Sequence, residues 1–215
     1  MRYPNAIQRP GPASKTGYDG LTSNACRGVV CHSMVGSYTS AMGELDNLAR
    51  RASWCFSVLQ SGSVIQHYDS AAVTWHADSK RANGLYIGIE HEGGLSPFSE
   101  PLTPAQAQAS VELVRWLAQG HGFPLVRKVA LWEHREMAST ACPSGRIPWH
   151  LYTEEEEDDM KPLLVWNIDK QAVFLVGPFG AVWVTDAADV PALEGLYGKM
   201  TVALHDSTLR QLLPK

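Results

Sequence analysis

The chain has 215 residues, of which 45% are hydrophobic, and a formal net charge of −4. This size and hydrophobic content are typical of a globular protein that buries a substantial core as one large or two small domains. The sequence pI of about 6.0 excludes the clustered basic excess typical of nucleic-acid-binding proteins. We therefore expect no nucleic-acid partner.

No segment contains the roughly 18 consecutive apolar residues of a membrane span, and the N-terminus lacks an apolar stretch of signal-peptide length. We therefore expect that the protein does not insert into a membrane. We also expect that it is made in the cytoplasm without an export signal. The four cysteines, Cys26, Cys31, Cys55 and Cys142, show no paired CxxC spacing. Cys31 and Cys55 lie in apolar segments and are expected to be reduced core residues.

Hydrophobic periodicity predicts alternating strands and helices in the first half of the chain. In order, these are an irregular lead-in (1–25), a buried strand (27–33), a helix (40–52), and a hairpin (53–59 with 64–68). The strand 27–33 carries His32 near its end. The next segment, 71–77, is expected to be a loop or a short helical turn.

Apolar residues alternate with other residue types over 85–92, which predicts a strand. Gly88 and Glu90 lie on the face opposite the apolar residues, and Gly93-Gly94 ends the strand. Thr103 before a proline predicts the start of a helix that runs to about residue 119. A last short strand, 129–132, leads into Glu133 and His134.

Strands alternating with helices predict an α/β domain over residues 1–153. Six acidic residues follow, and the repulsion between them favours a solvated linker over 154–161. The rest, 162–215, is expected to form a small α+β module with a hairpin (172–176 with 181–184) and short segments capped by Asp189 and Asp206. About fifty residues are few for independent stability, so this module is expected to dock onto something.

An imidazole and a thiol, those of His134 and Cys142, lie in one segment after the predicted strand 129–132. Nitrogen and sulfur are the donors that zinc prefers, and a catalytic zinc site takes three protein ligands and leaves a fourth position open. His32 also ends a buried strand, so it can meet the other two at one edge of the sheet. Each histidine taken alone is more often structural.

Four short motifs occur in a fixed order: VVCHSM at 29–34, WHA at 75–77, IGIEHEG at 87–93, and the segment from His134 through Cys142-Pro143. Together, over about 25–150, they resemble the zinc N-acetylmuramoyl-L-alanine amidases of type 2. That family includes phage endolysins and peptidoglycan recognition proteins. The resemblance implies a central mixed β-sheet flanked by helices, and a Zn²⁺ ion in a surface groove held by His32, His134 and Cys142.

The resemblance also implies the reaction, which is hydrolysis of the amide between N-acetylmuramic acid and the first L-alanine of the stem peptide. Glu90 matches the acidic residue that acts as general base in part of the family. Glu92, on the same strand face, is its rival. His76 matches a position expected near the substrate, where it would bind the stem peptide or stabilise the tetrahedral intermediate. A structural histidine is the alternative.

Two positions depart from many phage members of the family. Trp54 stands where they carry a tyrosine, and an indole N–H donates a hydrogen bond but does not shuttle a proton. Thr140 stands where they carry a lysine. In this it resembles the recognition proteins that retain amidase activity, which also lack the lysine. Its hydroxyl is expected to assist catalysis without supplying charge. These departures place more of the proton transfer on Glu90.

The sequence therefore favours a phage-type zinc amidase that acts on the bacterial cell wall after release from the cytoplasm, with peptidoglycan as its partner. One alternative is a recognition protein of the same fold that binds peptidoglycan without cutting it. Another is a cysteine peptidase that uses Cys142 and His134. The module 162–215 has two readings, cell-wall attachment or subunit association, and the sequence does not indicate an oligomeric state.

Overall fold

The computed structural model of the chain describes residues 1–94, 100–153, 163–177, 180–184, 190–191 and 202–204. The chain divides into two compact units, Met1–Glu154 and Glu155–Lys215. The predicted acidic linker, 154–161, lies outside the described residues. Within the described part of the chain, no helix is long and apolar enough to span a lipid bilayer.

The first unit is built on a six-stranded sheet in the order β1-β4-β3-β5-β2-β6. Its strands are β1 (Ile7–Gln8), β2 (Val29–Ser33), β3 (Phe56–Val58), β4 (Val64–Gln66), β5 (Ile87–His91) and β6 (Leu131–Glu133). Only β3 and β4 pair antiparallel, and the other neighbours are parallel. Its helices are α1 (Tyr38–Asp46), α2 (Lys80–Leu85) and α3 (Pro104–His121), with short 3-10 turns at Ala13–Lys15, His134–Glu136 and Trp149–Leu151.

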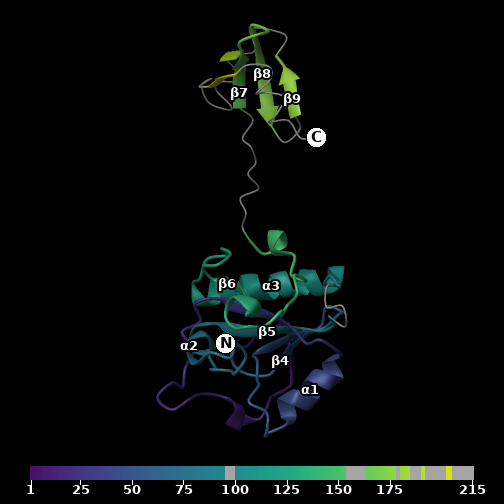
Figure 1. Ribbon diagram of the computed structural model, residues 1–215, viewed down its shortest axis with the longest axis vertical. Coiled ribbons are helices and arrows are strands. Elements are labelled where there is room, and N and C mark those ends of the chain that lie inside the picture. The colour runs from purple at the N-terminus through teal and green to yellow at the C-terminus, as the bar shows by residue number, and fades with distance from the viewer. Residues whose placement is uncertain (95–99, 154–162, 178–179, 185–189, 192–201, 205–215) are drawn as a thin grey trace. The chain divides into compact units, whose positions relative to one another are not determined.

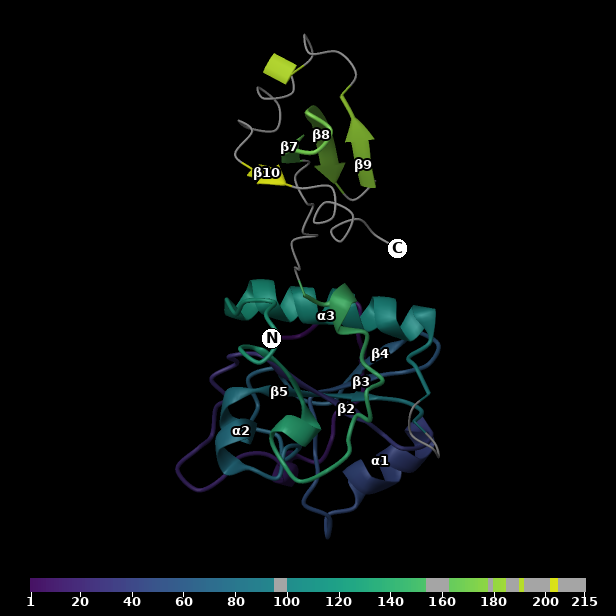
Figure 2. The same cartoon turned by 45° about the horizontal axis from the view of Figure 1, so that its top comes forward.

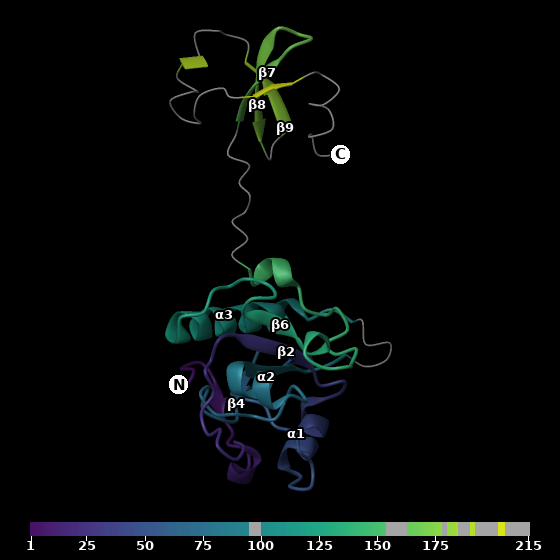
Figure 3. The ribbon, with the colours of Figure 1, turned by 60° about the vertical axis from the view of Figure 1, so that its left-hand side comes forward.

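Helix α3 lies on one side of this sheet, and α1 and α2 lie on the other (Figures 1 and 2). The same layering is visible after rotation about the vertical axis (Figure 3). This arrangement confirms the predicted central mixed sheet flanked by helices. It also confirms the predicted hairpin, which is β3 paired with β4.

Three adjacent parallel strands bring the candidate site together. Strand β2 lies between β5 and β6, and its register places His32 opposite Glu90 and Cys31 opposite Glu133. Because the strands are parallel, their carboxyl ends lie at the same edge of the sheet. His134 follows β6 directly, so it reaches the edge where β2 ends with His32.

The core fills the space between the sheet and α3. Val29, Ile87 and Ile89 belong to one buried cluster with Leu113 and Leu117 of the helix. Side chains alternate between the two faces along a strand. Glu90 is adjacent to Ile89, and His32 is three residues after Val29, so both point to the opposite side of the sheet. The predicted core positions of Cys31 and Cys55 are confirmed, because both are fully buried free thiols.

Helix α1 ends earlier than predicted: the sequence pattern extended it over 40–52, whereas the helix covers Tyr38–Asp46. The buried amine of Lys15 explains where it ends. Its Nζ donates to the carbonyl oxygens of Glu44 and Leu45, both at 2.8 Å. These carbonyls belong to the last turn of the helix, where they lack partners within the helix.

Helix α2 (Lys80–Leu85) was not predicted. It is short, its interior asparagine and glycine are weak helix formers, and its main sequence signal is the cap residue Ser79, whose Oγ accepts from the backbone N–H of Ala82 at 3.3 Å. The strand predicted over 85–92 begins after this helix, at the first residue of Ile87–His91.

Helix α3 begins as predicted, since the Oγ1 of Thr103 accepts from the backbone N–H of Gln106 at 3.1 Å. It continues to His121 and ends at Gly122, which has the left-handed conformation with φ of 74°. The predicted end near residue 119 was two residues short. The prediction used Gly120 as the end of the helix, whereas Gly122 is the residue that ends it.

The second unit contains a four-stranded sheet in the order β10-β7-β8-β9. The strands are β7 (Leu163–Asn167), β8 (Ala172–Gly177), β9 (Gly180–Trp183) and β10 (Val202–Leu204). Antiparallel pairing of β8 with β9 confirms the second predicted hairpin. Asp189 and Asp206, the expected caps of two short segments, lie outside the described residues.

Candidate metal centre

Three side chains converge at the edge of the first sheet. The candidate ligand atoms of His32, His134 and Cys142 all lie within 4.8 Å of one another. His32 comes from the end of β2, His134 from the 3-10 turn after β6, and Cys142 from the following loop. The rings of the two histidines lie 4.5 Å apart between centroids. The structure thus brings together the three residues that the sequence proposed as metal ligands.

The protonation state of this cluster fits zinc. Burial lowers the pKa of both His32 and His134, so both imidazoles are neutral and have a lone pair to offer near pH 7. The Nε2 of His134 is buried and has no hydrogen-bond partner among the described residues. Two neutral imidazoles and one sulfur match the donors of a catalytic zinc site with an open fourth position.

Cys142 lacks the features of a nucleophile. Its Sγ accepts a hydrogen bond from the backbone N–H of Ser33 at 3.1 Å. Burial raises the pKa of its thiol to about 12, whereas nucleophilic cysteines have a lowered pKa. Metal binding requires the thiolate, so a bound cation would have to displace the proton of this thiol.

A buried guanidinium supports the loop that carries Cys142. Arg146 is 2% exposed, and it donates to the Oγ of Ser33 at 2.7 Å and to the carbonyl oxygen of Glu92 at 3.1 Å. It therefore ties this loop to the ends of β2 and β5. The sequence analysis did not identify Arg146, because an arginine in a loop is usually exposed and no pattern marks this one.

Glu90 directs its carboxylate at the cluster. Its Oε1 lies 4.0 Å from Nδ1 of His32, and its Oε2 is buried without a hydrogen-bond partner among the described residues. Burial raises the pKa of this carboxyl group to about 8. A partly desolvated carboxyl group beside a candidate metal site is suited to accept and return a proton.

Glu92, the rival of Glu90, is engaged elsewhere. Its Oε1 accepts from the backbone N–H of Tyr38 at 2.8 Å, and its Oε2 accepts from the backbone N–H of Gln60 at 3.1 Å. The first of these bonds satisfies a free donor at the start of α1. Glu92 therefore stabilises the fold, whereas Glu90 keeps a buried oxygen with no hydrogen-bond partner among the described residues.

His76 lies directly against the candidate ligand His32. Its Nδ1 is 3.0 Å from Nε2 of His32, and its Nε2 is 3.1 Å from the carbonyl oxygen of Tyr86. Both ring nitrogens are used inside the protein. The expected contact with the stem peptide or the tetrahedral intermediate stays a prediction, and it would require the ring to give up one of these partners.

Thr140 and Trp54 both have internal partners. Thr140 is exposed, and its Oγ1 accepts from the backbone N–H of Cys142 at 3.2 Å. Trp54 is buried, and its Nε1 donates to the Oγ of Ser57 at 2.8 Å. Thr140 therefore lies next to a candidate ligand, whereas the indole N–H of Trp54 is already committed.

The remaining histidines in the described part of the chain are structural or exposed. His91 bonds through Nδ1 to the carbonyl oxygen of His32 at 2.9 Å and through Nε2 to Ser110 at 2.7 Å. His67 and His121 also have hydrogen-bond partners, and His150 is exposed. His205 lies outside the described residues.

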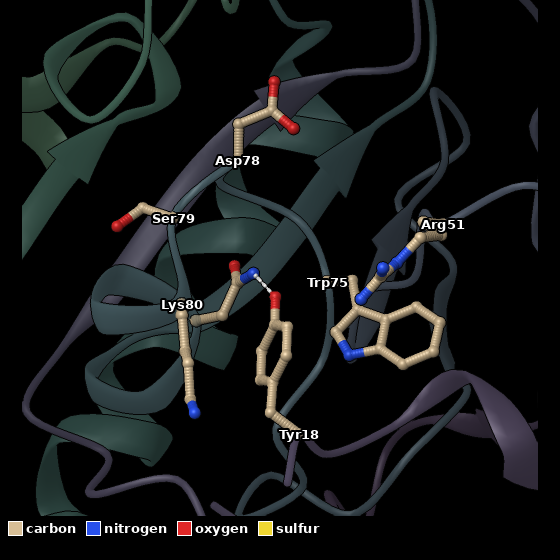
Figure 4. Close-up of a pocket in the computed structure, with 7 residues that line it drawn as sticks. Tyr18, Arg51, Trp75, Asp78, Ser79 and Lys80 are labelled. Atoms are coloured by element: carbon tan, nitrogen blue, oxygen red, sulfur yellow. Dashed lines mark hydrogen bonds between the residues drawn. The ribbon is translucent and has the colours of Figure 1, made fainter.

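A pocket of about 300 Å³ shares the segment that carries His76, and the sequence analysis did not identify it. It is lined by Tyr18, Arg51, Trp75, Asp78, Ser79, Lys80 and Asn83. Figure 4 shows the guanidinium of Arg51 directed at the ring of Trp75. The Cζ of Arg51 lies 5.3 Å from the centroid of that ring. The hydroxyl of Tyr18 accepts from the amide of Asn83 at 2.6 Å. The pocket thus combines aromatic surface with two cations and the carboxylate of Asp78.

Several solved structures share the fold of the first unit. The amidase LysC from Clostridium intestinale matches with a TM-score of 0.53 and 20% identity, covering 69% of this chain and 94% of that one. An AmpD derivative matches with a TM-score of 0.53 and 18% identity, covering 70% and 94%. The catalytic domain of XlyA matches with a TM-score of 0.51 and 20% identity, covering 65% of this chain and 90% of that one. These likenesses concern the fold.

A sequence relative carries the same family name. N-acetylmuramoyl-L-alanine amidase A of Achromobacter lyticus is 30% identical over 112 residues, which are 52% of this chain. The chain spans about three fifths of that relative, since the match covers 61% of its length. Residues 22–145 match the family description N-acetylmuramoyl-L-alanine amidase. Because this match includes more than half of the chain, the chain belongs to the N-acetylmuramoyl-L-alanine amidase family.

Proposed function

We propose that this protein is a zinc-dependent hydrolase of the endolysin type that cleaves the amide between N-acetylmuramic acid and L-alanine in bacterial peptidoglycan. The observation that carries the proposal is the convergence of His32, His134 and Cys142 beside Glu90, whose Oε2 has no hydrogen-bond partner in the described part of the chain. Family membership supports the choice of bond. Its place of action is the bacterial cell wall.

The residues of the site divide the chemistry between them. Zinc, when bound, lowers the pKa of water and polarises a carbonyl group. Glu90 takes a proton from the attacking water at its free Oε2 and returns it to the leaving amine, which is the N-terminus of L-alanine. Thr140 lies close enough to the Cys142 loop for its hydroxyl to donate to the developing oxyanion.

The pocket in Figure 4 supports a place for the peptide side of the substrate. Stem peptides carry carboxylates, and Arg51 and Lys80 supply two cations around this pocket. Trp75 supplies a flat ring and directly precedes His76, which contacts His32 of the metal cluster. We infer that the stem peptide extends from the cleaved bond toward these residues.

The alternative, a recognition protein that binds peptidoglycan without cutting it, is favoured by the residues at positions 54 and 140. Neither Trp54 nor Thr140 is a proton shuttle at neutral pH. The desolvated carboxyl group of Glu90 favours hydrolysis, because burying a carboxyl group without a partner is costly for a role in binding alone.

One assay separates these readings. The full-length protein is incubated with purified cell walls, with and without a zinc chelator, and new N-terminal alanine and new reducing sugar are both measured. Release of N-terminal alanine that stops with chelator and returns with added zinc is the expected result. Wall binding without alanine release would support the recognition protein, and alanine release that resists the chelator would reject the zinc mechanism.

For the second unit we propose attachment to the cell wall. The family match ends at residue 145, before this unit begins at Glu155, so the amidase fold does not account for it. A variant that lacks 155–215 is expected to pellet less with purified walls while it binds zinc normally. If that variant pellets as well as the full chain but changes its oligomeric state, the unit serves subunit association instead.

A further inference from the structure

Two hydrogen bonds connect the candidate ligand His32 to a backbone carbonyl. The Nε2 of His32 lies 3.0 Å from Nδ1 of His76, and the Nε2 of His76 lies 3.1 Å from the carbonyl oxygen of Tyr86. The two rings meet edge to face at 89°. His32 and His76 are almost completely buried, so water does not compete strongly for these bonds.

The carbonyl group at the end of this series decides where the protons are. A carbonyl oxygen only accepts hydrogen bonds, so the Nε2 of His76 carries a proton and donates it to Tyr86. In a neutral imidazole the other nitrogen is then an acceptor. The Nδ1 of His76 therefore accepts from Nε2 of His32, and the Nδ1 of His32 has a free lone pair.

A doubly protonated His76 would reverse the second bond, but its surroundings disfavour the charge. Its two ring partners are a carbonyl oxygen and another imidazole, and neither carries a negative charge. An imidazolium ion buried without a carboxylate partner is costly. The neutral form with protonated Nε2 is thus the state that the contacts support.

The position of the His76 ring is fixed by two further contacts. An added Cβ at Gly88 would lie 2.6 Å from Cγ of His76, so the ring packs directly against the backbone of β5. The Oδ1 of Asn83 accepts from the backbone N–H groups of His76 at 3.1 Å and of Ala77 at 2.8 Å. The ring is thereby held in place independently of any metal.

We propose that His76 is a positioning residue: together with the carbonyl of Tyr86 it holds His32 in the tautomer and ring orientation that present Nδ1 to the metal. A carbonyl or carboxylate usually orients a metal-binding histidine directly. Here a second histidine is inserted between the ligand and the carbonyl. The inference rests on the proposed zinc site, but its structural part concerns the metal-free protein.

The first test uses the unmodified full-length protein. Long-range ¹H–¹⁵N NMR of the histidine side chains, with metal removed, distinguishes the two neutral tautomers of each ring. We expect His32 and His76 both to be protonated at Nε2 and unprotonated at Nδ1. Protonation of His32 at Nδ1, or a mixture of tautomers at that ring, would overturn the inference whatever the activity of the protein.

The second test compares His76→Leu with His76→Asn by titrating zinc into each metal-free protein against a chromophoric chelator. Leucine removes the acceptor, and zinc affinity is expected to fall roughly 10- to 100-fold. Asparagine places an oxygen near the position of Nδ1, so it should recover part of that loss. The Nε2 proton of His32 should exchange with water faster in the leucine variant than in the asparagine variant.

His67→Leu is the matched control, because His67 is also buried and bonds to Ser57 and to the carbonyl oxygen of Arg9, both at 2.9 Å. It should lose stability but keep wild-type zinc affinity. Wild-type affinity in His76→Leu would overturn the proposal. If that variant does not fold, the asparagine variant and the tautomer measurement decide. Normal tautomers and zinc affinity without wall hydrolysis would reject only the proposed function.

Discussion

Gly88 and His76 are in such close contact that an added Cβ at Gly88 would lie 2.6 Å from Cγ of His76. Gly88→Ala therefore forces the ring of His76 away from β5 and disturbs its bond to His32. We expect roughly tenfold weaker zinc binding and a lower free energy of unfolding. Chelator competition measures the first quantity and urea denaturation the second.

Gly43→Ala is the control for this substitution. Gly43 lies in α1, and an added Cβ there would meet nothing within 4 Å, so alanine should raise the free energy of unfolding by up to about 1 kcal/mol. Zinc affinity should stay at the wild-type value. Equal zinc affinity in both alanine variants would show that the contact between Gly88 and His76 does not serve the metal site.

Glu90→Gln and Glu92→Gln separate the two carboxylates. Glu90 has the free buried oxygen beside the cluster, so its amide variant should lose roughly 10²- to 10⁴-fold in kcat and keep about one zinc per chain. Glu92 accepts two backbone hydrogen bonds, so its variant should lose stability and keep its rate. Alanine release from walls and zinc content are the measurements, and the reverse pattern would move the base to Glu92.

Cys142→Asp tests whether the thiol is a ligand or a nucleophile. Carboxylate oxygen is an accepted zinc donor, and the backbone N–H of Ser33 that now bonds to Sγ would have an oxygen acceptor in its place. The variant should keep zinc and part of its activity, whereas Cys142→Ala should lose both. A cysteine peptidase would be inactive with either substitution, so complete inactivity of a zinc-loaded Cys142→Asp protein would contradict the ligand role.

Acid should destabilise the first unit through its buried histidines. Burial lowers the pKa of His67 to about 4, against about 6.5 in the unfolded chain. Between these values the unfolded chain binds the extra proton, so the free energy of unfolding falls as pH drops from 6.5 to 4 and is fully retained above 6.5. Each such group contributes a slope of up to about 1.4 kcal/mol per pH unit.

Urea denaturation of the wild type and of His67→Gln at several pH values measures this slope. The variant should show a shallower dependence across the same window, because it lacks one of the titrating groups. An identical slope in both proteins would mean that His67 is not buried in its neutral form.

The sequence was informative where a residue's position follows from strand geometry. His32, His134 and Glu90 lie on or directly after parallel strands, so alternation and the shared strand ends bring them together. Contacts set by loop packing were not accessible in this way. The direction of the His76 ring depends on its packing against Gly88, and the burial of Arg146 depends on how its loop folds back. Both therefore required the three-dimensional arrangement.

The most direct test of the account is a zinc titration of metal-free protein with purified cell walls, followed by the rate of N-terminal alanine release. If the protein is a zinc amidase, the rate rises in proportion to added zinc and levels off at one zinc per chain. Full activity without zinc, or no alanine release at any zinc concentration, would contradict it.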